Sequence, residues 1–301
     1  VPPPPSPLRV DGFMRSHWGA WTRRPLDEMW AKGRQSLDLS ARYKKNQLRV
    51  RLDAHIEYDL LYPYDEARDT PRLDPAQREV YEWQYINGEQ LIAYRAGSLE
   101  LSTGRQIVTW GEADALSALD MINPRDQREP GVADVDDLRL AVLMTRLRYA
   151  QGPFDVDFVV RHEGHYGLLV PPLADYSPLR AALPQELSTL LSGREARYGH
   201  DREGVGADTQ SYFLRALYRG QGLDAGVYAA SLIDMQGVFD DLNPADFLAL
   251  LAQPNAPFEL PQAHKRFELV GLSGATSVGS WLFKGEVAAY LNRSMNTGAP
   301  S

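Results

Sequence analysis

The sequence predicts an all-β fold, a transmembrane antiparallel up-and-down β-barrel with about eleven strands visible and short helices in the long loops. Three observations predict it. Polar and apolar residues alternate along unusually long segments, tight and long connections follow one another in strict turn, and tyrosines recur where strands end at tight turns. Together these features are typical of bacterial outer-membrane barrels, whose strands separate lipid from a polar interior.

The clearest alternation covers residues 47–60, fourteen in all, where an ordinary globular strand has five or six. The apolar positions are Leu48, Val50, Leu52, Ala54, Ile56, Tyr58 and Leu60. Between them stand charges of both signs, including Arg49, Arg51, Asp53, His55 and Glu57. A strand with two such faces borders an apolar medium on one side and water on the other.

Other segments repeat the pattern. The expected strands are residues 10–21, 36–43, 47–60, 79–94, 99–110, 138–149, 154–162, 211–218, 224–233, 266–272 and 278–291. Because single-chain bacterial barrels have an even number of strands, we expect this sequence to be incomplete at its C-terminal end. Asn87 and Gly88 interrupt the fourth strand, and we interpret them as a bulge, with an Asn-Gly hairpin as the alternative.

Four tight turns share a local repeat in which a tyrosine ends one strand and a large apolar residue begins the next. The connections between these hairpins are long, at residues 22–34, 61–77, 111–137, 163–210 and 234–264. Short turns face the periplasm in outer-membrane barrels, where aromatic rings gather at the lipid headgroups. We therefore predict a periplasmic aromatic girdle of Tyr43, Tyr94, Tyr149 and Tyr218.

The expected organisation is a single domain. Residues 1–9 form an extended Pro-rich leader, residues 10–291 the barrel, and residues 292–301 a flexible tail. Loops 111–137, 163–210 and 234–264 fold inward or cap the barrel, with helices at 177–191 and 244–251. Because the sequence begins without a charged and apolar leader segment, we expect any signal peptide to have been removed.

Composition excludes several classes. There is no apolar run approaching the 18 or so residues of a membrane-spanning helix. The net charge of -8 argues against a nucleic-acid partner, and the absence of cysteine excludes disulfides and thiolate metal sites. No phosphate-binding or nucleophile motif is present, so we expect no cofactor and no enzyme activity.

Residues 104–130 are the most specific part of the chain. Gly111 turns the chain after a strand, residues 112–120 favour about two helical turns, and paired charges follow. A loop so rich in charge fits inside a barrel as a luminal constriction, although an exposed polar loop explains the charges equally well. The predicted constriction and selectivity residues are Arg105, Trp110, Glu112, Asp114, Asn123, Asp126, Arg128 and Glu129.

This region also carries a resemblance. The runs GRQIVTWGEAD at 104–114, INPRD at 122–126, REPG at 128–131 and DVDDLRLAVLMTRLRY at 134–149 closely resemble the Gram-negative outer-membrane proteins grouped as domain of unknown function 1302. Further likenesses are GFMRS at 12–16, REVY at 78–81, RHE at 161–163 and KGEVAAY at 284–290. Ala141 departs from the proline common in relatives, and family barrels continue for several more strands.

The resemblance implies an outer-membrane channel or transport component for hydrophobic or lipid-like solutes, without known catalytic residues. The implied partners are outer-membrane lipid, the barrel-assembly machinery and other envelope transport proteins. The alternative function is a hydrolytic or metal site near His162 and His165, in an outer-membrane barrel or a periplasmic β-protein. Their spacing is HxxH at a strand end, whereas zinc proteases place HExxH on a helix. Asp134, Asp136 and Asp137 are a further candidate site, for Ca²⁺.

Overall fold

One antiparallel sheet dominates the computed structural model, which describes residues 6–22, 29–67, 78, 80–111, 117–129, 138–172, 174, 177, 196–239 and 258–296. Its eleven strands lie side by side in chain order, each beside its neighbour in sequence, which is the predicted up-and-down arrangement. They are β1 (Leu8–Ala20), β2 (Trp30–Lys45), β3 (Leu48–Asp59), β4 (Trp83–Ala96), β5 (Leu99–Gln106), β6 (Val142–Gln151), β7 (Phe154–Arg161), β11 (Ser211–Arg219), β12 (Leu223–Ile233), β14 (Arg266–Val278) and β15 (Trp281–Leu291).

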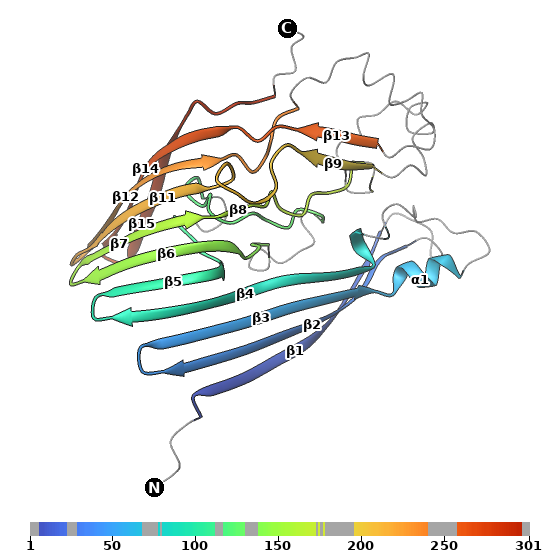
Figure 1. Cartoon of the computed structure of the whole chain (residues 1–301), viewed down its shortest axis with the longest axis horizontal. Coiled ribbons are helices and arrows are strands. Elements are labelled where there is room, and N and C mark those ends of the chain that lie inside the picture. The colour runs from blue at the N-terminus through green and yellow to red at the C-terminus, as the bar shows by residue number, and fades with distance from the viewer. Residues whose placement is uncertain are drawn as a thin grey trace.

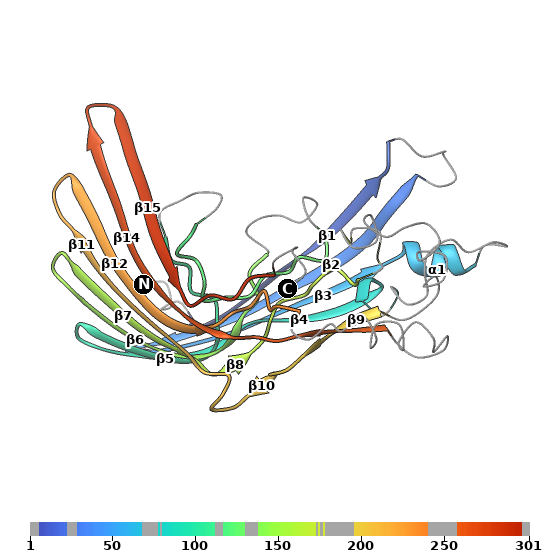
Figure 2. The ribbon, with the colours of Figure 1, turned by 90° about the horizontal axis from the view of Figure 1, so that it is seen from above.

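The sheet curves into a deep trough, with β1 and β15 at its two edges (Figures 1 and 2). In the described part of the chain these edges do not pair with each other, so the sheet stays open. Two small sheets lie at the end with the long connections: β8 (Glu163–Gly164) pairs with β10 (Gly204–Val205), and β9 (Ala196–His200) runs parallel to β13 (Phe258–Gln262). No helix among the described residues is long and apolar enough to cross a membrane.

The two faces of the sheet differ as the alternation predicts. On the convex face, large apolar side chains are exposed: Leu52 at 55%, Ile92 at 54% and Leu272 at 54%. On the concave face the side chains between them are polar or packed, and Asp157 is fully buried. Because successive side chains of a strand point to opposite faces, period two in the sequence becomes this division.

The tight hairpins lie together at one end of the sheet (Figure 1). The register places each predicted girdle tyrosine opposite the first residue of a neighbouring strand: Tyr43 faces Leu8, Tyr94 faces Leu48, Tyr149 faces Leu99, and Tyr218 faces Phe154. The sequence repeat therefore brings four tyrosines to one rim, while their role as a girdle stays a prediction.

Several strand limits differ from those expected. The bulge is confirmed, because Gly88 and Glu89 both lie opposite Asp53 and the Asn-Gly hairpin does not form. Strand β14 extends to Val278 and turns at Gly279, whose φ of +62° suits a glycine, so the gap predicted after residue 272 is wrong. Strand β5 ends at Gln106 instead of 110, because the chain leaves the sheet there and crosses the concave face.

The helices also differ in part. A short helix, α1 (Leu61–Glu66), begins the connection after β3, where none was predicted. The helical turns predicted within 112–120 are wrong for the described residues 117–120, which are irregular with a bend at Ala118 and Leu119. Tertiary packing of Leu119 in the apolar cluster replaces local helical bonding there. The helices predicted at 177–191 and 244–251 lie outside the described residues, except for Ser177, which is not helical.

An apolar core fills the concave face on its C-terminal side. Residues 107–111 and 117–122 supply Val108, Trp110, Leu119 and Ile122, which pack on strands β6, β7, β11, β12 and β14. The Trp110 ring lies edge-on to Phe213 at 6.0 Å between centroids and is 3% exposed. The green traces of these two stretches run inside the trough (Figure 2).

Candidate functional site

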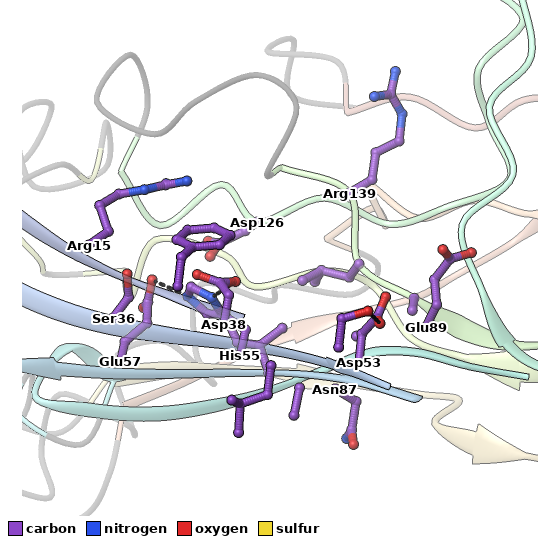
Figure 3. A pocket seen from close by; sticks show the side chains of 18 of the residues that line it. Arg15, Ser36, Asp38, Asp53, His55, Glu57, Asn87, Glu89, Asp126 and Arg139 are labelled. Carbon is purple, nitrogen blue, oxygen red and sulfur yellow. Dashed lines mark hydrogen bonds and ion pairs between the residues drawn. The ribbon is translucent and has the colours of Figure 1, made fainter. Parts of the chain in front are cut away.

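A cavity of about 350 Å³ lies on the N-terminal side of the concave face. Strands β1 to β4 form its wall, and residues from 126–129 and 138–141 cover it. The side chains labelled in Figure 3 are mostly charged and carry both signs, and apolar side chains lie between them. This cavity is the candidate functional site, because polar groups converge there from strands and from the segment that crosses the trough.

Residues 107–111 and 117–129 lie across the concave face, and we call them the crossing segment. Glu129 joins this segment to the sheet. Its carboxylate accepts hydrogen bonds from the Lys32 ammonium and from Arg34 Nη2 at 2.7 Å, and Arg34 Nη1 lies 3.3 Å from Glu57 Oε1. Lys32 is 3% exposed and Glu129 8%. Because unpaired charges at such burial are costly, these ion pairs hold the segment where it is.

Arg128 adds a second connection. Its guanidinium donates to both oxygens of Asp126, to Glu57 Oε2 at 3.2 Å and to the Val80 carbonyl at 3.0 Å, and Arg128 is 1% exposed. Burial alone would lower the pKa of Arg128, but the hydrogen bonds and charge of Asp126, with Glu57, raise it above its ordinary value. Arg128 is therefore a fixed cation. We call Lys32, Arg34, Glu57, Arg128 and Glu129 the ion-pair latch.

The Asn123 side chain holds the crossing segment in place through hydrogen bonds to backbone groups. The side-chain oxygen accepts from Val108 N at 2.8 Å, and the amide nitrogen donates to the carbonyls of Gln106 and Leu140, both at 2.9 Å. Asn123 is 2% exposed. One side chain thus satisfies three buried backbone groups where the chain leaves β5 and returns toward β6.

Asp120 balances two further cations. Its Oδ2 accepts from Arg125 Nη2 at 3.1 Å and from Arg139 Nη2 at 2.7 Å. Gly167, with φ of +93°, lies against the Arg125 carbonyl where a Cβ would overlap it. These contacts join residues 120–125 of the crossing segment to Arg139 and Gly167. Asp120 is not among the site residues predicted from the sequence.

The wall of the cavity carries its own polar network. Both ring nitrogens of His55 face carboxylates, with Nδ1 2.6 Å from Asp38 Oδ1 and Nε2 3.1 Å from Glu57 Oε1. On the same strands, Ser40 donates to Asp53 at 2.7 Å. Figure 3 shows Asp38, His55 and Glu57 grouped at one side of the cavity, and Asp53 at the other.

The structure separates the predicted constriction residues. Asp126, Arg128 and Glu129 line the cavity. Trp110 and Asn123 belong to the crossing segment and are buried. Arg105 does not line the cavity; it donates to Glu163 at 2.6 Å and to the Ala141 carbonyl. Glu112 and Asp114 lie outside the described residues, as do the acidic residues Asp134, Asp136 and Asp137.

Lys32 and Arg34 were missed by the sequence interpretation, which assigned residues 22–34 to a long loop. A signal was present, since Lys32, Arg34 and Ser36 continue the polar face of the strand backward in steps of two. Strand β2 begins at Trp30, and the register places Arg34 opposite Asp59 and Ser36 opposite Glu57.

His162 and His165, the alternative site, have separate partners. His162 Nε2 lies 2.9 Å from the Thr145 hydroxyl, and His165 Nδ1 accepts from Gly167 N at 3.1 Å. Burial lowers the pKa of His165. Among the described residues, no group of three or more His, Asp or Glu side chains is arranged to hold a metal ion.

A different histidine pair joins the long connections. His264 Nδ1 lies 2.7 Å from the Asp234 carbonyl, which only accepts, so His264 Nε2 accepts from His200 Nδ1 at 2.9 Å. Tyr166 stacks on His264 at 3.4 Å between ring centroids. Burial lowers the pKa of both histidines and raises that of Tyr166 to about 12. The neutral pair therefore ties residues 200 and 264 together.

These features define the class of the molecule as an all-β protein built on one large up-and-down sheet, with an anchored segment crossing its concave face. Residues 83–300 match the family described as "Protein of unknown function (DUF1302)". The chain belongs to this family, which confirms the resemblance in its sequence. None of the curated proteins matches it significantly.

Solved structures with a similar sheet include the outer membrane protein opdK from Pseudomonas aeruginosa, with 11% identity and a TM-score of 0.35. The match covers 94% of this chain and 66% of opdK. A mutant of the Rh. blastica porin has 7% identity and a TM-score of 0.30, with 94% and 84% covered. Pseudomonas aeruginosa OccK2, in complex with glucuronate, has 7% identity and a TM-score of 0.31, with 94% and 58% covered.

Proposed function

We propose that this chain forms the wall of a β-barrel in the bacterial outer membrane, acting as a channel or transport component without chemistry of its own. The two faces of the sheet support this. The convex face exposes Leu52, Ile92, Leu101, Val270 and Leu272 at 50% or more, a surface that suits lipid acyl chains better than water. The concave face carries charges beside the cavity and near the tight hairpins, as the interior of a water-filled barrel does.

The ends of the sheet give the orientation. Tight hairpins lie at one end and long connections at the other, so we assign the hairpin end to the periplasm. Tyr94 is 55% exposed and Tyr218 42%, which leaves their rings available to the headgroup region. Tyr43, Tyr94, Tyr149 and Tyr218 would form the girdle there. Outer-membrane lipid and the barrel-assembly machinery are the partners such a barrel requires.

The observation that carries the proposal is the attachment of residues 107–111 and 117–129 across the concave face. Asn123 fixes the segment at its middle, Trp110 packs it on the C-terminal side, and the ion-pair latch fixes it on the N-terminal side. A segment held at three places narrows any lumen that the sheet encloses. For the solute, the family resemblance implies a hydrophobic or lipid-like molecule.

Conductance in planar lipid bilayers tests the constriction. The variant combines Asp126→Asn, Arg128→Gln and Glu129→Gln, which removes the charges that hold the segment to β2 and β3. Unit conductance should rise about twofold or more as the segment loosens. The control is Arg197→Gln with Glu259→Gln, an exposed pair at 60% and 48%, which should leave the conductance unchanged.

Two further results decide the outcome. A unit conductance equal to that of the unchanged protein would remove the constriction from the proposal. Detergent-free purification as a soluble, folded protein would contradict the barrel itself. Heat-modifiable mobility on gels, measured for every variant, separates an altered channel from a barrel that has not folded.

A further inference from the structure

The concave face near the tight hairpins carries more arginine than its carboxylates neutralise. Three carboxylates there, Glu100, Asp155 and Asp157, each bind two arginines. This group lies apart from the ion-pair latch, on strands β3 to β7 and β11. We call it the arginine cluster, and its six cations are Arg49, Arg95, Arg146, Arg148, Arg215 and Arg219.

Asp157 is the fixed centre of the cluster. Arg146 donates to it through two bonds, Nε to Oδ1 at 2.7 Å and Nη2 to Oδ2 at 2.6 Å, and Arg215 Nη2 adds a third at 2.6 Å. Asp157 is fully buried. The Arg215 guanidinium also lies 5.3 Å from the Trp110 ring centre, so it is held on two sides.

Each of the other two carboxylates holds one arginine closely and a second one more loosely. Asp155 accepts two bonds from Arg148, from Nε at 3.0 Å and from Nη2 at 2.5 Å, and one from Arg219 Nη1 at 3.3 Å. Glu100 lies 2.6 Å from Arg49 Nη2 and 3.3 Å from Arg95 Nε. Three arginine side chains stay well exposed: Arg49 at 49%, Arg95 at 55% and Arg219 at 55%. These three side chains are therefore accessible to a solute.

The strand register makes this arrangement continuous. Arg95, Glu100, Arg148, Asp157 and Arg215 lie opposite one another in turn across β4, β5, β6, β7 and β11. The row is thus built by the sheet, not by flexible side chains meeting at random. Six cations against three anions leave an excess of three, or two when Asp224, opposite Arg219, is included. The chain as a whole has a net charge of -8, so its overall composition does not explain the local excess.

We propose that the arginine cluster binds the anionic group of a solute, a carboxylate or a phosphate, near the tight-hairpin end of the concave face. This inference rests on the proposed channel function, and it identifies the transported solute as an anion. Guanidinium is weakly hydrated and presents a planar fork of donors that fits oxyanions. Because these exposed arginines already pair with carboxylates, they bind a further anion only weakly. Weak binding lets a solute leave the site again during transport.

Ion selectivity in planar bilayers is the first test. In a KCl gradient, the reversal potential should show that chloride permeates better than potassium. The variant Arg49→Gln with Arg95→Gln and Arg219→Gln should lower the chloride-to-potassium permeability ratio about threefold or more. Glu100→Gln should raise the ratio, and Arg197→Gln, outside the eleven-stranded sheet, should leave it unchanged. An equal ratio in all four proteins would overturn the proposal.

Direct binding is the second test and does not need a conducting channel. Detergent-solubilised protein should broaden the proton NMR signals of hexanoate, the phosphorus signal of inorganic phosphate, or both. The triple arginine variant, with unchanged heat-modifiable mobility, should broaden neither. Broadening of one probe alone identifies the preferred oxyanion. Absence of broadening with both probes overturns the binding site, whereas broadening without any conductance leaves the site and contradicts the channel.

Discussion

The two halves of the concave face hold the crossing segment in different ways. On the C-terminal side, Trp110, Leu119 and Ile122 pack against apolar strand residues, and the contact is closed. On the N-terminal side, the latch residues Arg128 and Glu129 join the segment to β2 and β3 through ion pairs, and a cavity of about 350 Å³ remains beside them. One segment therefore has a packed anchor and an electrostatic anchor.

The difference teaches what each kind of contact permits. Apolar packing is non-directional and leaves no space, so the C-terminal half gives stability and rigidity. Buried ion pairs depend on partners and geometry, and replacing one partner is enough to weaken them. The N-terminal half is thus the side on which the segment can yield. The predictions below test this division, beginning with the largest expected effect.

Removing the packed anchor should cost most. Trp110→Ala leaves a cavity among Phe213, Tyr228 and their neighbours, and should lower the free energy of unfolding by about 3 to 5 kcal/mol. Urea titration in detergent micelles, followed by heat-modifiable mobility, measures the loss. Trp281→Ala is the control, because this side chain is 74% exposed at a hairpin. Equal losses in the two variants would contradict the packed anchor.

Breaking the electrostatic anchor should cost less. Glu129→Gln leaves Lys32 and Arg34 without this carboxylate at 3% and 8% exposure, and should lower the free energy of unfolding by about 3 kcal/mol. Adding Lys32→Met removes one uncompensated buried charge and should restore part of the loss. The same urea titration gives both values. If the double variant is less stable than Glu129→Gln alone, the buried charge is not the cause.

Asn123→Ala tests the point between the two anchors. It leaves Val108 N and two carbonyls without their bonds, and should cost about 2 kcal/mol. Asn296→Ala is the matched control, since the Asn296 side chain accepts an exposed hydrogen bond from Phe239. Hydrogen exchange at Val108 should accelerate in the Asn123 variant only. Unchanged protection there would show that Asn123 does not hold the segment.

The smallest effect concerns pH. Burial lowers the pKa of His200 and His264 below the ordinary value of 6.5, so the unfolded connections take up protons first as the pH falls. The stability that the neutral pair provides is present above pH 6.5 and is lost below it. Hydrogen exchange, corrected for its intrinsic rate, should therefore increase in residues 196–200 and 258–264 between pH 7.5 and 5.5. In the His264→Asn variant, hydrogen exchange in these residues should no longer depend on pH. Slower exchange at pH 5.5 than at pH 7.5 in the unchanged protein would contradict the role of the neutral pair.

Much of the sheet follows from the sequence, because alternation and turn chemistry are local. The long strand at 47–60 and the turn after Ala96 were predictable from residue order alone. The turn at Gly279 was harder to predict, since Ser273, Gly274 and Ala275 weaken the alternation before it. Strand β5 ends at Gln106 for a reason found elsewhere in the chain, in the partners that Trp110 and Asn123 meet.

The candidate site was predictable in part, because charge density is also a local feature of the sequence. Charge density pointed to residues 126–129, and three of the eight predicted residues meet in the cavity. Sequence could not show that Glu129 pairs with Lys32, 97 residues away, or that Trp110 would be buried. Such partners depend on the curvature of the sheet, which brings β2 and the crossing segment together.

The position of Asn123 has a consequence for the order of assembly. Its three backbone partners lie within 17 residues along the chain, so they are available once β5 and β6 have paired. Trp110 needs Phe213 and Tyr228, about a hundred residues later. Loop closure over the shorter distance costs less entropy. The crossing segment can therefore bind beside β5 and β6 before the later strands have formed, and those strands then pack against a segment that is already in place.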